Sequence, residues 1–272
     1  MSENTFVIAS IGFGPRESTV MLTLVTLAKN RKPSFVLFES QNEKKHADIL
    51  LIDADNAEAI IKWNTYIKKF NQDENISSIM ITDDPPANSE ADRIIYLKKP
   101  MTATKLLSLL EETVIKNHGY QVPELFEGKI TKIDIKNKNE KSDITENKTV
   151  NLSALVVDDS LPIRIQMKKA LENISCNVEF AETGEEAIKL VNTNDYNIIF
   201  LDVILPGIDG YDICKSIKKN PDKSKTPVIM LTSNSSPADR IKGKMAGCDT
   251  YLIKPVRADI FKEVVYEFLD LD

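Results

Sequence analysis

Five side chains that could act together on a phosphoryl group stand directly after short apolar segments of this 272-residue sequence. They are three carboxylates, one hydroxyl and one ammonium, from Asp158, Asp159, Asp202, Thr232 and Lys254. Mg²⁺ prefers oxygen ligands, which Asp159 and Asp202 could supply directly and Asp158 directly or through a water. Lys254 and Thr232 could each bind a phosphoryl oxygen. Once metal and ammonium neutralise the charge repulsion, Asp202 is expected to receive a phosphoryl group as an aspartyl phosphate.

The apolar segments that precede these residues are predicted to be parallel strands. Short apolar runs alternate with amphipathic segments, a pattern that is typical of a parallel sheet covered by helices on both faces. The carboxyl ends of such strands meet at one edge of the sheet, which would bring the five side chains together. The predicted strands are Leu152–Val157, 177–180, 198–201, 228–231 and Thr250–Ile253, and the predicted helices are 162–174, 185–191, 211–218, 238–245 and 258–269.

The first part of the chain shows the same alternation of apolar and amphipathic segments, which indicates an internal repeat of a whole domain. When the third strands are aligned, Asp53 corresponds to Asp202, Thr82 to Thr232, and Lys99 to Lys254, which Pro follows in both cases. The predicted strands are Thr5–Ile11, 34–38, 48–52, 78–81 and 93–97, and the predicted helices are 16–29, 57–69 and 102–116.

Three segments follow from these patterns. Residues 1–118 and 152–272 are predicted to be α/β domains, each long enough to bury a core of its own. Residues 119–151 are predicted to be a linker, because periodicity fades there and the stretch 135–149 is polar and almost charge-balanced.

Composition excludes several classes of function. The net charge of −6 and the pI near 5.2 disfavour a nucleic-acid binder, which normally carries a basic face. No apolar stretch is long enough to span a bilayer, so membrane insertion is not expected. Three scattered cysteines without a CxxC pair favour a reducing cytoplasm. With two histidines in the chain, His-rich metal sites and Ser-His triads are not expected.

Residues 152–272 resemble a response-regulator receiver domain from end to end, through the motifs VVDDS, LDVILPGIDG, MLTS and YLIKP. The resemblance implies a five-stranded flavodoxin-like fold and Mg²⁺-dependent phosphorylation of Asp202 by a phosphohistidine partner. It also implies a switch in which Thr232 turns toward the phosphoryl group and the aromatic side chain of Tyr251 follows. In this family the backbone carbonyl two residues beyond the acceptor completes the metal shell, and here that residue is Ile204.

The N-terminal half resembles the same family but lacks the acidic pair that would hold the metal ion. Counting back from Asp53 the same 43 residues that separate Asp159 from Asp202 leads to Ser10, and no acidic residue lies in VIASIGFG. Asp83 and Asp84, which follow Thr82, are the substitute metal ligands that the sequence offers. The segment that joins Thr82 to the last strand is too short for a full helix. We therefore expect a degenerate receiver used for contact.

The predicted function is that of a cytoplasmic two-component response regulator with tandem flavodoxin-like domains. Its expected partners are a sensor histidine kinase or a histidine phosphotransfer protein and a downstream protein effector, with a homodimer left open. No enzyme activity is expected beyond the chain's own phosphoryl transfer and dephosphorylation. The alternatives are a phosphate sink or relay, a piece of a larger regulator with a separate output domain, and a phosphohydrolase of the haloacid-dehalogenase type. The last carries its nucleophile on the first strand, whereas Asp202 follows the third.

Overall fold

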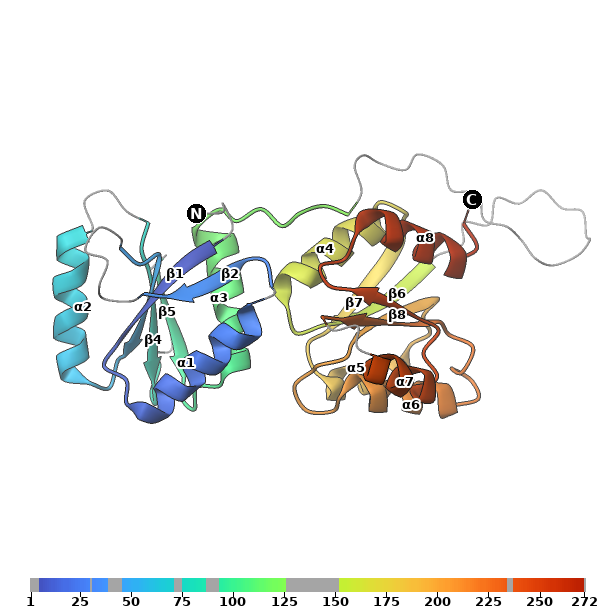
Figure 1. Ribbon diagram of the computed structural model, residues 1–272, viewed down its shortest axis with the longest axis horizontal. Coiled ribbons are helices and arrows are strands. Elements are labelled where there is room, and N and C mark those ends of the chain that lie inside the picture. The colour runs from blue at the N-terminus through green and yellow to red at the C-terminus, as the bar shows by residue number, and fades with distance from the viewer. Residues whose placement is uncertain are drawn as a thin grey trace, which may run out of the picture. The chain divides into compact units, whose positions relative to one another are not determined.

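The computed structural model of the protein divides the chain into two compact units, Met1–Gln121 and Val122–Asp272 (Figure 1). It describes residues 5–29, 31–38, 46–70, 75–86, 93–125, 152–233 and 237–271. Each unit contains a five-stranded sheet in which every paired strand is parallel. The predicted fold class, two α/β domains with parallel five-stranded sheets, is confirmed.

The C-terminal unit alternates strand and helix along its described length, as the sequence predicts. Its sheet has the strand order β10-β9-β8-β6-β7. The strands are β6 (Leu152–Val157), β7 (Cys176–Ala181), β8 (Ile198–Asp202), β9 (Val228–Thr232) and β10 (Thr250–Ile253). The helices are α4 (Leu161–Glu172), α5 (Gly184–Thr193), α6 (Gly210–Lys219), α7 (Pro237–Ala246) and α8 (Ala258–Phe268).

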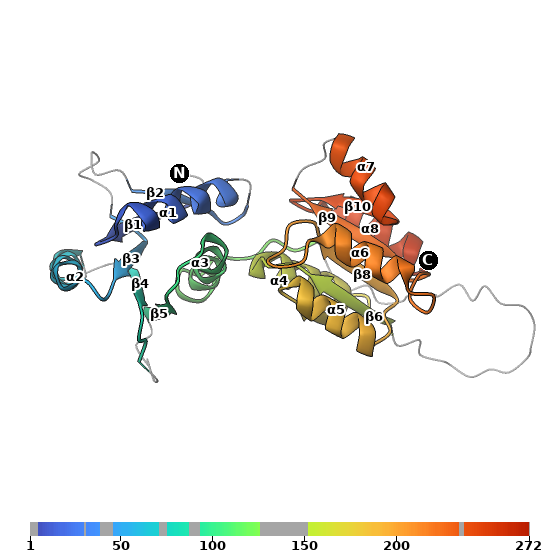
Figure 2. The same ribbon diagram turned by 90° about the horizontal axis from the view of Figure 1, so that it is seen from below.

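Two hydrophobic clusters pack on the opposite faces of this sheet, because successive side chains of a strand point to opposite sides. Val156 of β6 joins the cluster with α4 and α8, where Phe200 and Phe261 lie 5.5 Å apart between ring centroids. Val157 joins the cluster on the other face, with Ile213 of α6. Helices α5 and α6 cover that second face and lie in front of the sheet in Figure 2. The carboxyl edge of the sheet, where the predicted site residues lie, is thereby held between two packed layers.

The N-terminal unit has the corresponding sheet, in the order β2-β1-β3-β4-β5. Its strands are β1 (Thr5–Ile11), β2 (Ser34–Leu37), β3 (Ile49–Asp53), β4 (Ser77–Thr82) and β5 (Ile94–Lys98). Its described helices are α1 (Pro15–Ala28), α2 (Ala57–Phe70) and α3 (Ala103–Asn117). Residues 83–86 are not helical, in agreement with the short predicted connection, and residues 87–92 lie outside the described part of the chain.

The helices of the N-terminal unit are distributed unequally over the two faces of its sheet. Helices α1 and α3 lie together on one face, with Leu24 and Leu110 fully buried (Figure 1). Among the described helices, α2 alone covers the other face, where Ala59 packs with Leu50 and Met80. Within the described residues, this sheet is therefore covered by fewer helices than that of the C-terminal unit.

The first compact unit ends at Gln121, three residues beyond the predicted end of the first domain at residue 118. Tyr120 is 5% exposed and its ring packs edge-on against Phe6 of β1, so this part of the predicted linker belongs to the N-terminal core. Leu125 joins the core of the C-terminal unit. The remaining residues of the predicted linker, 126–151, lie outside the described residues.

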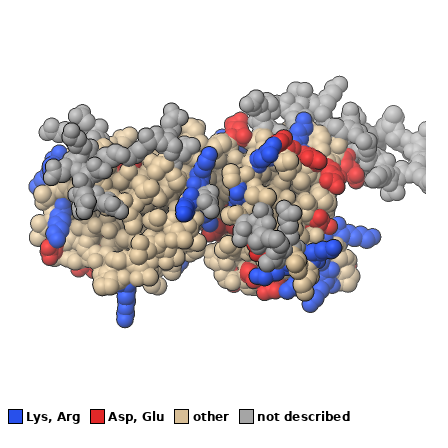
Figure 3. All heavy atoms as spheres, viewed as in Figure 1, with Lys and Arg blue, Asp and Glu red and all other residues tan. Residues whose placement is uncertain are grey.

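On the face shown in Figure 3, basic and acidic side chains are interspersed over the C-terminal unit. Within the described residues, no helix has both the length and the apolar character needed to cross a bilayer.

Candidate functional site

The acidic side chains of the C-terminal unit converge because their strands are parallel and in register. Val157 at the end of β6 lies opposite Leu201 of β8, so that Asp158 and Asp202 follow at the same level. Carboxylate oxygens of Asp158, Asp159 and Asp202 all lie within 4.8 Å of one another. All three residues are buried, with exposed fractions of 0%, 6% and 4%. Among the described residues this is the one group of three acidic, His or Cys side chains with that spacing.

Lys254 brings a positive charge into this acidic group. Its backbone N–H donates to the Thr232 carbonyl at 2.8 Å, which continues the pairing of β10 with β9 beyond Ile253. Its Nζ lies 2.6 Å from Asp158 Oδ2 and 2.9 Å from Asp202 Oδ2. Burial alone would lower the pKa of Lys254, but the two carboxylates more than offset that effect and raise it. Lys254 is therefore a fixed cation at the sheet edge.

Asp202 lies in a strongly anionic, buried environment. Burial and the neighbouring charge of Asp158 raise its pKa to about 7, although Lys254 acts in the opposite direction. Three carboxylates against one ammonium leave an excess of negative charge, which a divalent cation would neutralise. The buried site thus has the donor set and the charge that suit such an ion.

Arg164 and Ser160 hold the loop that carries Asp158, and sequence reasoning missed both residues. The N–H of Ser160 donates to Asp158 Oδ1 at 2.9 Å. Arg164 Nη1 donates to the Asp158 carbonyl at 2.8 Å, while Nη2 forms an ion pair with Glu182 at the end of β7. A polar residue in the first turn of an expected helix gives no distinctive sequence signal, because such positions are usually solvated.

The remaining predicted site residues stand on β9 and β10 and just after β8. Thr232 ends β9 and is 5% exposed. The N–H of Ile204 donates to Asp202 Oδ1 at 3.4 Å, while its side chain is 67% exposed. The hydroxyl of half-buried Tyr251 donates to the Asp239 carbonyl of α7 at 3.3 Å. Tyr251 lies so close to Gly243 that a Cβ there would overlap its hydroxyl, so the ring needs this glycine.

The N-terminal unit keeps three of these positions and lacks the acidic pair. Asp53, Thr82 and Lys99 stand at the ends of β3, β4 and β5, and Lys99 Nζ lies 2.8 Å from Asp53 Oδ1. The strand register corrects the counterpart inferred by counting. Ile11 lies opposite Ile52, so Gly12 and Phe13 occupy the places of Asp158 and Asp159, rather than Ser10. The conclusion that no acidic pair is present at this position is unaffected.

Comparison with known proteins gives the family. A model of the response regulator receiver domain matches residues 154–266. Protein PilG of Pseudomonas aeruginosa is 39% identical over 110 residues, which are 40% of this chain and 82% of PilG. Transcriptional regulatory protein ResD of Bacillus subtilis is 38% identical over 109 residues, 40% of this chain and 44% of ResD. A putative response regulator structure from Chloroflexus aurantiacus is 32% identical, covering 44% of this chain and 98% of that one, with a TM-score of 0.42.

The chain belongs to the response regulator receiver family through its C-terminal unit. The N-terminal unit has the same kind of five-stranded parallel sheet, so the protein carries tandem receiver-like domains. The match spans most of PilG but less than half of ResD.

Proposed function

We propose that the C-terminal unit, residues 152–272, accepts a phosphoryl group on Asp202 from a phosphohistidine partner and signals through protein contacts. The observation that supports this most is the position of Lys254, whose ammonium lies within ion-pair distance of Asp202 and Asp158 on a buried edge. Membership of the receiver family points to the same chemistry. The three free cysteines suit work in the reducing cytoplasm.

Asp158, Asp159 and Asp202 are the residues that would hold Mg²⁺, together with the backbone carbonyl of Ile204. Their carboxylate oxygens are close enough to share one ion. When bound, Mg²⁺ would neutralise charge between the nucleophile and the phosphoryl oxygens. Weak binding is expected, since Mg²⁺ usually keeps several of its waters.

The transfer itself needs little covalent chemistry from the protein. A carboxylate oxygen of Asp202 forms a bond to phosphorus while the P–N bond of the phosphohistidine breaks, and the imidazole leaves with the electron pair. Lys254 then contacts one phosphoryl oxygen and the Thr232 hydroxyl another. As Thr232 turns toward the phosphoryl group, the side chain of Tyr251 changes position with it. Positioning and charge stabilisation supply most of the rate enhancement in such transfers.

The N-terminal unit is proposed to be an interaction module that does not take phosphate. With Gly12 and Phe13 at these positions, Asp53 lacks the two carboxylates that stand beside Asp202 in the C-terminal unit. The two units, joined by the proposed linker, would keep a partner near the signalling receiver.

Incubation of the full chain with acetyl phosphate, or with phosphoramidate as a P–N donor, tests the proposal. With Mg²⁺ present, intact-mass spectrometry should show one added phosphoryl group per chain, and with EDTA none. Absence of labelling under both donors would contradict the proposal. Multiple turnover of an unrelated phosphate ester would favour the phosphohydrolase instead, and back-transfer to a phosphotransfer histidine would favour a relay.

The aspartyl phosphate is expected to outlast the seconds-scale lifetime of fast-switching receivers. The exposed Ile204 side chain, two residues after Asp202, cannot hydrogen-bond and orient a water for attack on phosphorus. The other residue expected to influence this attack, Asn234, lies outside the described residues. Following the intact mass after removal of the donor measures the decay, and Ile204→Asn should accelerate it. Decay of the wild type within seconds in Mg²⁺ buffer would show this expectation wrong.

A further inference from the structure

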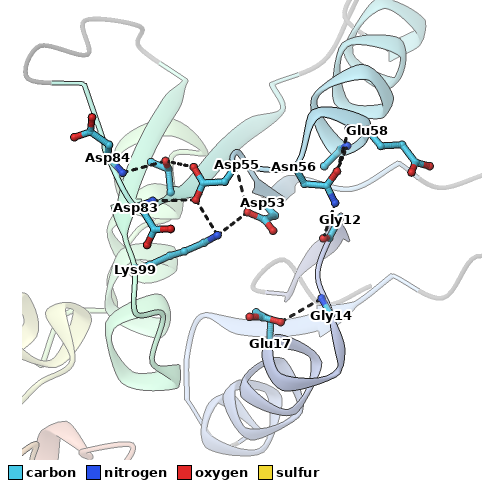
Figure 4. A network of polar contacts seen from close by, with 12 residues as sticks. Gly12, Gly14, Glu17, Asp53, Asp55, Asn56, Glu58, Asp83, Asp84 and Lys99 are labelled. Carbon is cyan, nitrogen blue, oxygen red and sulfur yellow. Dashed lines mark hydrogen bonds and ion pairs between the residues drawn. The ribbon is translucent and has the colours of Figure 1, made fainter.

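The carboxylate of Asp55 is bound by three donors of the N-terminal unit (Figure 4). The Thr82 hydroxyl donates to Oδ1 at 2.5 Å. The backbone N–H of Asp83 donates to Oδ2 at 3.0 Å, and Lys99 Nζ lies 2.9 Å from the same oxygen. The donors come from the ends of two neighbouring strands, β4 and β5, so Asp55 links them to the loop after β3.

The same three donors exist in the C-terminal unit at the same positions of the sheet. Asp53 lies opposite Ile81 as Asp202 lies opposite Leu231, which makes Thr82 the counterpart of Thr232. The N–H of Lys99 donates to the Thr82 carbonyl at 2.9 Å, as that of Lys254 donates to Thr232 at 2.8 Å. The N–H groups of Asp83 and Ser233 therefore correspond as well.

The two units differ in the residue that stands two places after the aspartate of the third strand. In the N-terminal unit this residue is Asp55, which turns toward the three donors. In the C-terminal unit it is Ile204, whose side chain is 67% exposed. Ile204 brings no carboxylate toward Thr232 and Lys254, and Lys254 pairs with Asp158 and Asp202 instead. In the N-terminal unit Thr82 and Lys99 hold the carboxylate of Asp55.

The environment keeps Asp55 ionised. Hydrogen bonds from Thr82, Lys99 and the Asp83 N–H lower the pKa of this carboxyl to about 2. The pKa of Lys99 is raised, first by its hydrogen bond to Asp53 and also by Asp55. At neutral pH the pair is therefore fully charged, and charge-assisted hydrogen bonds of this kind are stronger than neutral ones.

We propose that Asp55 permanently occupies the positions that phosphoryl oxygens take in a phosphorylated receiver, and so holds the N-terminal unit in a phosphorylated-like state. This rests on the function proposed above for Thr232 and Lys254. The intramolecular carboxylate is always present at its donors, so it excludes a phosphoryl group and fixes Thr82 without any signal. The N-terminal unit then presents one constant surface beside β4 and β5, while the C-terminal unit switches.

The backbone amide resonances of Asp83 and Ser233, measured by NMR on the full chain, test the proposal. An N–H that donates to an anion resonates downfield. In the unphosphorylated chain the Asp83 amide should already be downfield, and the Ser233 amide should move downfield when acetyl phosphate and Mg²⁺ are added. Asp55→Ala should return the Asp83 amide upfield, and Asp55→Asn should do so in part, because its amide retains one acceptor oxygen.

Glu58→Gln is the matched control, since it removes one negative charge three residues away while Glu58 pairs with Lys62 on the exposed face of α2. It should leave the Asp83 amide in place. An Asp83 amide that shifts no more in Asp55→Ala than in Glu58→Gln would overturn the proposal. Failure of Ser233 alone to move would instead count against the proposed function, since the response of Asp83 to Asp55→Ala does not depend on phosphorylation.

Discussion

Replacing Asp202 with Asn is expected to abolish phosphorylation of the protein by acetyl phosphate and Mg²⁺. The amide oxygen of Asn is uncharged and a poor nucleophile toward phosphorus, and an amide is also a weaker ligand for Mg²⁺. The side chain keeps its size, and Lys254 retains its ion pair with Asp158, so the fold should persist. Intact-mass spectrometry should show one added group in the wild type and none in the variant.

Asp53→Asn supplies the matched control, because Asp53 and Asp202 stand at equivalent positions of β3 and β8. This variant should be labelled as fully as the wild type. If Asp202→Asn retained the wild-type stoichiometry while remaining folded by circular dichroism, the assignment of the acceptor would be wrong.

The double substitution Asp158→Asn and Asp159→Asn is expected to remove Mg²⁺ binding and all metal-dependent labelling. The two side chains supply most of the negative charge beside Asp202 and two of the carboxylates that share the buried edge. Lys254 keeps Asp202 as a partner, and relief of repulsion among the carboxylates offsets the lost ion pair with Asp158. The unit should therefore fold. A Mg²⁺ titration followed through the Ser160 and Ile204 amides measures the loss.

A control variant that removes two negative charges from the surface distinguishes an effect of the site itself from an effect of the lower net charge. Glu172→Gln with Glu263→Gln takes two charges from exposed positions of α4 and α8 and should leave the titration unchanged. An unaltered Mg²⁺ response in the Asp158 and Asp159 variant would place the metal elsewhere.

The fold could be predicted from the sequence because β6, β8, β9 and β10 are short, largely apolar runs that end at or just before a polar residue. The predicted strands Leu152–Val157 and Thr250–Ile253 agree with the structure at both ends. The meeting of Asp158, Asp202 and Lys254 followed from the parallel sheet alone, because the ends of parallel strands share one edge.

Residue counting failed in the N-terminal unit because its first connections differ in length from those of the C-terminal unit. Counting places the counterpart of Asp159 at Ser10, whereas the register of β1 against β3 places it at Phe13, directly after Gly12. Strand register is set by packing and backbone hydrogen bonds rather than by sequence distance. Gly12 itself is informative, since its φ of +88° and its proximity to Ala59 leave no space for a side chain.

The role of Asp55 was not predicted, although its signal was present in the sequence. ILLIDAD carries a second carboxylate two residues after Asp53, where the C-terminal unit has Ile204. An acidic residue after a strand is usually solvated, and nothing in the local sequence shows that Thr82 and Lys99 lie within reach. The contact depends on the ends of three strands, so it emerged only from the tertiary structure.

The central claim is that Asp202 of the C-terminal unit takes the phosphoryl group and that the N-terminal unit takes none. Locating the phosphoryl group in the wild-type chain tests this claim most directly. The full chain, labelled with acetyl phosphate and Mg²⁺, can be reduced with borohydride, which converts an aspartyl phosphate to homoserine, and the peptides mapped by mass spectrometry. We expect conversion at Asp202 close to the labelled fraction, and none at Asp53. Stoichiometric conversion at Asp53, or labelling without conversion at Asp202, would contradict the account.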